Sequence, residues 1–284
     1  MRKGIVFTMI SAVVYGVAPV FTKITYEGGA NGVTISFLRV LSLPVLFVIM
    51  RAMKISLSLT KKEAIDVFAA CGLGFGVTTL LLFCSYSHIP VGMATTLHFI
   101  YPIAVSFACI VFFREKLSMP MLFALVMCSA GVVLFTGNTS GASAKGIAMA
   151  LASGLTYAFF LVYVDKSELK NMNHFKISFW MGVMLVLFSG VFGTLTGTLP
   201  LNLTMKAWGL AAVLSICKAV VAVTTLQIGI QLSGATTASI LSTLEPITSF
   251  ALGVLILGES FSTAKAMGVI CVVIAVITIS AQKK

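Results

Sequence analysis

Two stretches of 25 residues decide the fold: ATTLHFIYPIAVSFACIVFFREKLS at 94–118 and ASILSTLEPITSFALGVLILGESFS at 238–262. Six positions are identical in the two stretches, and Pro102 matches Pro246. Each stretch is a long apolar run that contains a proline and ends in a polar turn. Such a run predicts a helix that crosses a lipid bilayer, because about 20 apolar helical residues span its hydrocarbon core.

The relation between the two stretches extends to the rest of the chain. Lys3-Gly4-Ile5 recurs as Lys145-Gly146-Ile147, and Tyr15 matches Tyr157 at the same offset of 142 residues. This offset is half of the 284 residues, so the sequence predicts two similar units, 1–139 and 140–284.

The composition agrees with a membrane protein. Hydrophobic residues make up 59% of the chain and charged residues only 10%, whereas about a quarter of a soluble domain is charged. We therefore expect an all-α integral membrane protein, and Thr60 and Glu63 form a capping-box pattern at the start of its third span. The ten expected spans are 4–23, 31–50, 65–87, 90–113, 119–137, 145–164, 175–197, 207–231, 234–257 and 265–281.

The charges report orientation. Each unit has five spans, an odd number, so the second copy should enter the membrane upside down, as in the inverted repeats of many transporters. With a cytoplasmic N-terminus, 13 of the 19 Lys and Arg residues fall on the cytoplasmic side. This bias predicts that both termini are cytoplasmic in the cell membrane. It also accounts for the net charge of +11 without a nucleic-acid partner.

The prolines and polar turns of the two stretches resemble those of a known family. Tyr101-Pro102 leads to Arg114-Glu115-Lys116-Leu117, and Leu244-Glu245-Pro246 leads to Leu257-Gly258-Glu259. This layout is similar to the EamA-type branch of the drug/metabolite transporter superfamily. The resemblance implies a ten-helix bundle around a central cavity, lined mainly by spans 1, 3, 4, 6, 8 and 9, that exports amino acids or related metabolites. It also implies gating or structural roles for Arg39, Glu115 and Glu259.

Lys218 and Glu245 are ionisable residues near the middle of their spans. Such groups cost several kcal/mol in hydrocarbon, so each is a candidate functional residue. They could hold the carboxylate and the amine of a zwitterionic substrate, or act as a proton-coupled switch. The structural alternative is a buried ion pair that never meets substrate.

Other polar groups reach a similar depth. His98 could bind substrate or carry a proton, or it could only hydrogen-bond a neighbouring helix. Tyr15, Tyr101 and Tyr157 could line an aromatic cavity, or could pack in the core. Pro102 and Pro246 predict kinks beside this cavity.

The function expected from these features is alternating-access export of an amino acid or a similar small metabolite. Nucleobases, vitamins or drug-like solutes are alternative substrates, and a passive channel is an alternative from another class. Motifs of intramembrane enzymes such as HExxH and GxSxG are absent from the sequence, so we expect no enzyme. The six cysteines show no CxxC spacing, and we expect no metal or cofactor. The expected partners are a small-molecule substrate, the lipid bilayer and a proton, with the chain a monomer or a weak dimer.

Overall fold

The computed structural model describes residues 2–89, 91–134, 143–257 and 263–281, and every regular element within them is helical. The label α marks α-helices and η marks short 3₁₀ or π segments. In chain order the elements are α1 (Arg2–Glu27), α2 (Gly32–Phe37), η1 (Leu38–Ser42), α3 (Leu43–Ala52), α4 (Lys61–Val67), η2 (Phe68–Gly76), α5 (Val77–Ser85), α6 (Val91–His98), α7 (Tyr101–Phe113), α8 (Met119–Leu134), α9 (Ala144–Lys166), η3 (Glu168–Asn171), α10 (His174–Thr196), α11 (Met205–Ile216), η4 (Cys217–Val223), α12 (Thr224–Leu241), α13 (Leu244–Leu257) and α14 (Thr263–Ser280).

The helices are those of a multi-pass membrane protein. Within the described residues, seven continuous helical stretches are long and apolar enough to cross a bilayer, and α8, α13 and α14 are shorter apolar helices. The expectation of an all-helical membrane protein is therefore confirmed. The count of ten crossings and the inverted orientation of the second unit stay predictions.

Local sequence signals set several helix ends. Thr60 Oγ1 accepts a hydrogen bond from the Glu63 amide at 3.2 Å, and the Thr60 amide donates to Glu63 Oε2 at 2.8 Å. The predicted capping box is thus present, and it starts α4 at Lys61, four residues before the expected span at 65.

Two spans are broken near their middle. Helix α6 ends at His98 and α7 starts at Tyr101, while α12 ends at Leu241 and α13 starts at Leu244. Pro102 and Pro246 were expected to kink continuous helices, but both lie in the first turn of a new one. A proline is well tolerated there, because the first amides of a helix have no intrahelical acceptor.

The boundary between spans eight and nine also differs from expectation. We expected separate spans at 207–231 and 234–257, but α12 runs on through a kink at Gly234 to Leu241. Gly234 has φ +79°, a conformation that glycine adopts without strain. The expected ninth span is therefore divided between the end of α12 and α13.

Irregular turns interrupt three further spans. Segment η1 is a 3₁₀ stretch between α2 and α3, and η2 and η4 are π segments between α4 and α5 and between α11 and α12. Ser11 and Ser178 donate hydrogen bonds to the η4 carbonyls of Ala222 and Ala219, at 2.7 and 2.6 Å. Hydroxyls from neighbouring helices thus satisfy backbone groups that a π segment leaves free, as lipid-embedded helices require.

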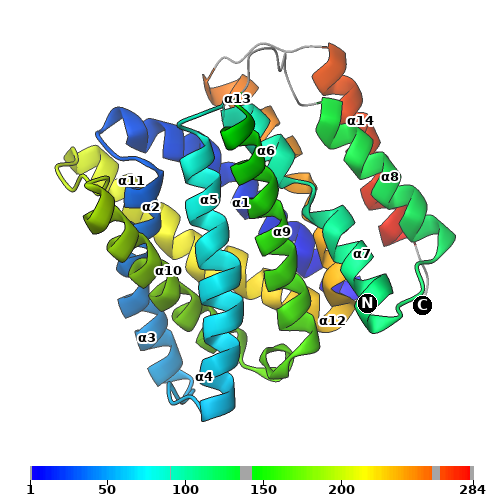
Figure 1. Ribbon diagram of the computed structural model, residues 1–284. Helices are drawn as coiled ribbons and strands as arrows, with labels where there is room; N and C mark the ends of the chain where they lie inside the picture. Colours follow the sequence, from blue (N-terminus) through cyan, green and yellow to red (C-terminus); the bar gives the residue numbers. More distant parts are fainter. Residues whose placement is uncertain (1, 90, 135–142, 258–262, 282–284) are drawn as a thin grey trace.

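The first helix of each unit packs on the broken helix of the other unit. Helix α1 packs along α12 and α13, and α9 packs along α5, α6 and α7. Helices α8 and α14 pair at one edge of the bundle (Figure 1), and the start of α1 and the end of α14 lie on the same side of it. The breaks are thereby held at the centre, between the two units.

Candidate substrate cavity

A cavity of about 170 Å³ lies where the interrupted helices meet. All six predicted substrate-binding residues line it, and so does Arg39. Its walls are Tyr15, Ile35, Ser36, Arg39, Phe75, Thr78, Thr79, Leu82, Phe83, His98, Tyr101, Tyr157, Leu185, Ala211, Leu214, Ser215, Lys218 and Glu245. Their roles in binding stay predictions, but the fold brings them to one place.

The Arg, Lys, His and Glu residues of this wall come from helix breaks. Arg39 is in η1, Lys218 is in η4, His98 ends α6 and Glu245 lies in the first turn of α13. Breaks of this kind often mark functional sites. The resemblance implied a lining mainly from spans 1, 3, 4, 6, 8 and 9. Span two, through Arg39, and span seven, through Leu185, line the cavity as well.

Lys218 and Glu245 face the same cavity without touching. Their charges interact, yet no nitrogen–oxygen distance of 4.0 Å or less joins these two described residues. The alternative of a closed ion pair is therefore not what the structure contains. Both side chains line the cavity, so a ligand in it could meet the ammonium and the carboxylate.

Several polar atoms around the cavity have no hydrogen-bond partner among the described residues. They are Arg39 Nε and Nη2, the hydroxyls of Tyr15 and Tyr101, and Ser215 Oγ. Buried polar groups are otherwise hydrogen-bonded almost without exception. Unpartnered donors that line a cavity can bind the polar groups of a ligand.

His98 is oriented by α9. Its Nδ1 lies 2.9 Å from Ser153 Oγ, which itself lies 2.6 Å from the Ala150 carbonyl oxygen. Because a serine hydroxyl has a single hydrogen and the carbonyl can only accept, Ser153 donates to Ala150 and accepts from His98 Nδ1–H. A hydrogen bond to a neighbouring helix, one of the two alternatives for His98, is thus present, and a role in binding stays a prediction. Nε2 is left as an acceptor when the ring is neutral.

Aromatic rings form one wall of the cavity. Tyr101 and Tyr157 meet edge to face, with centroids 4.8 Å apart and ring planes at 89°. The His98 ring lies 5.5 Å from Tyr101 and 5.4 Å from Tyr157, and Phe75 lies 6.2 Å from Tyr157. These separations are those of favourable aromatic pairs, so this wall is preorganised.

Two glycines allow the backbones to approach at the breaks. A Cβ at Gly154 of α9 would lie 2.5 Å from the His98 carbonyl oxygen, and a Cβ at Gly16 of α1 would lie 2.5 Å from the Glu245 carbonyl oxygen. Each is closer than a real contact allows. The first helix of each unit therefore reaches the break in the other unit only because it carries glycine at that point.

Charged residues join the two units at the end of the bundle that was predicted to be cytoplasmic. Glu115, which follows α7, forms an ion pair with Lys166 at the end of α9 and accepts a 3.5 Å hydrogen bond from Thr236. At the same end Lys62 pairs with Glu168 at 2.7 Å, and Lys176 pairs with Glu63 at 3.2 Å. Each of these links joins residues of different units.

The opposite end is joined by neutral hydrogen bonds. The Thr204 amide donates to the Gly28 carbonyl at 3.1 Å, and Asn31 Nδ2 donates to the Thr198 carbonyl at 2.9 Å. Glu259, the predicted counterpart of Glu115, lies outside the described residues. Gating roles for Glu115 and Glu259 stay predictions.

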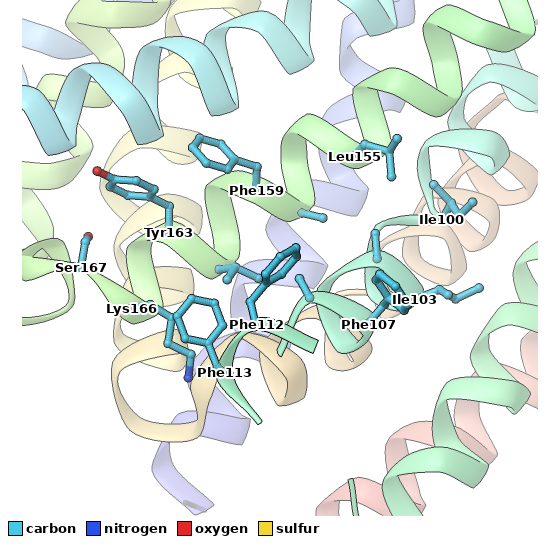
Figure 2. A pocket seen from close by; sticks show the side chains of 14 residues that line it. Ile100, Ile103, Phe107, Phe112, Phe113, Leu155, Phe159, Tyr163, Lys166 and Ser167 are labelled. Carbon is cyan, nitrogen blue, oxygen red and sulfur yellow. The ribbon is translucent and has the colours of Figure 1, made fainter. Parts of the chain in front are cut away.

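A larger hollow opens between α7 and α9. This lateral groove has a volume of about 870 Å³ and is almost entirely apolar, with Lys166 and Ser167 at one end. Figure 2 shows the rings of Phe107, Phe112 and Phe159 along it. These rings carry no groups that would recognise a polar solute.

Sequence reasoning missed the small polar residues of the cavity. Ser36, Thr78, Thr79 and Ser215 line it alongside the charged groups. Serine and threonine are common in membrane helices, where their hydroxyls bond to their own backbone, so their presence in a span signals nothing by itself. Among the described residues, no group of three or more His, Cys, Asp or Glu side chains could hold a metal ion.

Comparison with known proteins bears on the whole chain. The family model described as "EamA-like transporter family" matches twice, at residues 2–137 and 144–281. The chain belongs to the EamA-like transporter family. It therefore carries two EamA repeats, and the predicted relationship to the drug/metabolite transporter superfamily is confirmed.

A solved structure shares the fold of this EamA-like protein. It is titled only "Crystal structure of protein", and it superposes with a TM-score of 0.83, 15% sequence identity and coverage of 98% of both chains. At this identity the likeness speaks for the fold alone. No curated protein matches the chain.

Proposed function

We propose that this EamA-like protein exports an amino acid or a similar small metabolite across the cell membrane by alternating access. The observation that carries the proposal is the pair of opposite charges, Lys218 and Glu245, which line one cavity without forming an ion pair with each other. A zwitterion could present its carboxylate to the ammonium and its amine to the carboxylate. A cavity of about 170 Å³ favours a small metabolite over a drug-sized one, for which pockets of about 300 Å³ or more are usual.

Ten spans in two inverted units, with both termini cytoplasmic, would let two packings of similar energy expose the cavity to each side in turn. The ion pairs of Lys166, Lys62 and Lys176 support this mechanism, because they join the two units outside the cavity. These pairs would have to separate for the cavity to open at that end of the bundle. Charged pairs suit a reversible seal, since water can solvate them when they part.

Counterflow in proteoliposomes tests the proposal. Purified protein is reconstituted with an unlabelled mixture of amino acids inside, and each labelled amino acid is added outside in turn. Exchange with saturable kinetics is expected for at least one of them, and empty liposomes are the control. A flux that never saturates and is not accelerated from the opposite side would favour the passive channel.

A proton gradient imposed in either direction tests the coupling ion. Proton-coupled export should change in rate when the gradient is reversed. An equal rate in both directions would mean facilitated movement without protons.

A further inference from the structure

Arg39 is a buried cation without a carboxylate of its own. Its side chain is 4% exposed, and no Asp or Glu oxygen in the described part of the chain lies within 4.0 Å of it. Elsewhere in the fold, partly buried cations such as Lys170 and Lys176 are paired with carboxylates, on Asp165 and Glu63. Arginine cannot avoid the cost of burial by losing its proton, so its environment has to supply the missing charge or hydrogen bonds.

Neighbouring groups do not supply what the guanidinium lacks. The Tyr15 hydroxyl lies within hydrogen-bonding reach of the guanidinium but carries no negative charge, and Nε and Nη2 have no well-aligned hydrogen-bond partner among the described residues. The hydroxyl of Ser42 donates to the Arg39 carbonyl, and that of Ser36 donates to Gly32. The unpartnered donors belong to a residue that lines the cavity, where a ligand would meet them.

The charges of the cavity do not balance. Arg39 and Lys218 are its two cations, and Glu245 is the single carboxylate among the described residues that line it. Six other acidic residues are described: Glu27 is exposed at the end of α1, and Glu63, Asp66, Glu115, Asp165 and Glu168 lie in the segments near the ion pair of Glu115 with Lys166. A zwitterion would add no net charge and would leave one cation uncompensated.

We propose that Arg39 binds a carboxylate of the substrate, and that the substrate is an amino acid with a second acidic group, of the size of aspartate or glutamate. This inference rests on the proposed function and narrows its substrate class. One carboxylate bonds to the planar guanidinium fork, the second faces Lys218, and the amine faces Glu245. Two carboxylates and one ammonium then meet two cations and one carboxylate, so the occupied cavity is neutral. The assignment replaces the architectural role expected for Arg39.

Aspartate and asparagine form a matched pair of probes, because they have nearly the same shape and differ by one charge. Their binding to the detergent-solubilised protein is measured by thermal shift at pH 7, with glutamate and glutamine as a second pair. We expect the acidic member of at least one pair to bind about tenfold or more tightly than its amide. Arg39→Gln should weaken binding of that acid about 100-fold and change amide binding by less than about threefold.

Two further variants separate charge from structure. Arg39→Lys keeps the charge without the bidentate fork and should lose about tenfold. Lys206→Gln removes an exposed cation of α11 that lies outside the cavity, and it should leave both affinities unchanged. Monodispersity on size exclusion reports whether each variant is folded.

The outcomes separate the two proposals. Amides that bind as tightly as the acids, acids and amides that both fail to bind, or an Arg39→Gln protein that still prefers the acid would each overturn the inference. Counterflow of neutral amino acids would then leave the proposed function standing. Acid binding that depends on Arg39 without any counterflow would support the assigned site and reject transport.

Discussion

The lateral groove is larger than the central cavity, but the central cavity is the more polar of the two. The groove is about five times larger, at 870 against 170 Å³, yet its walls are apolar and Lys166 at its end is already paired with Glu115. An apolar hollow in a bilayer has little cost, because lipid chains fill it. Placing Arg39, Lys218 and Glu245 in the membrane costs free energy, so residues of this kind are usually kept because they have a function. Charge rather than volume therefore identifies the functional site.

The largest expected effect is on Lys218. Lys218→Met keeps the length of the side chain and removes the cation, so a substrate carboxylate loses a buried partner. We expect a loss of about 3 kcal/mol, or roughly 100-fold in transport rate at limiting substrate. Initial counterflow rates measure it, and Lys206→Met is the matched control on an exposed surface. Wild-type transport rates in Lys218→Met would contradict the assignment of the cavity as the substrate-binding site.

Gly154 tests whether the break at His98 has to be held in place. Gly154→Ala would put a methyl group 2.5 Å from the His98 carbonyl oxygen, and we expect a loss of roughly 1–3 kcal/mol in stability together with about tenfold slower transport. Gly209→Ala is the control, because a Cβ there meets nothing within 4 Å and alanine favours a helix by about 1 kcal/mol. Melting temperatures in detergent should fall for the first variant and hold or rise for the second. Equal melting temperatures would contradict the close packing of α9 on the break.

A smaller effect is expected at the bond between His98 and Ser153. His98→Phe keeps an aromatic ring in the cluster and removes the Nδ1–H donor, which should cost about 1 kcal/mol, or roughly fivefold in transport. Ser153→Ala removes the acceptor. If the bond is what matters, the double variant should be no worse than the more affected single one, and fully additive losses would show that His98 acts in another way.

The groove should give the smallest effect. Phe112, 73% exposed, can be replaced by leucine without opening a cavity, and we expect a change in transport of less than about twofold. Counterflow rates of Phe112→Leu and the wild type are compared in the same lipid. A tenfold loss would mean that the groove takes part in transport, and the contrast with the cavity would fail.

Much of the architecture could be predicted because membrane insertion leaves a strong mark on sequence. Apolar runs of the right length, the recurrence of Pro102 at Pro246 and the capping box at Thr60 indicated the helices and the duplication. The candidate site was also within reach of the sequence. Lys218, Glu245 and His98 stand out because ionisable groups are rare in spans, and counting along each helix brought them to one depth.

The predictions were less successful where the outcome depends on a neighbouring helix. The 3₁₀ and π segments, the divided ninth span and the exposed groove leave no local pattern, since a broken turn is tolerated only when hydroxyls such as those of Ser11 and Ser178 satisfy its carbonyls. The structural or gating role expected for Arg39 stays a prediction, because it also depends on neighbouring helices. The sequence shows only that Arg39 is a charged residue in a span. Whether that charge has a partner depends on residues far away in the chain.

The sequence alone determined that the chain lies in a membrane, that it is duplicated and which ionisable residues within spans are functional candidates. Each of these depends on composition and spacing along one chain. Packing alone decided which hollow receives those residues and that Lys218 and Glu245 form no ion pair. It also decided that Arg39 lines the same cavity without a carboxylate partner in the described part of the chain. These are properties of distances between helices, and close approaches such as that of Gly154 to His98 set them.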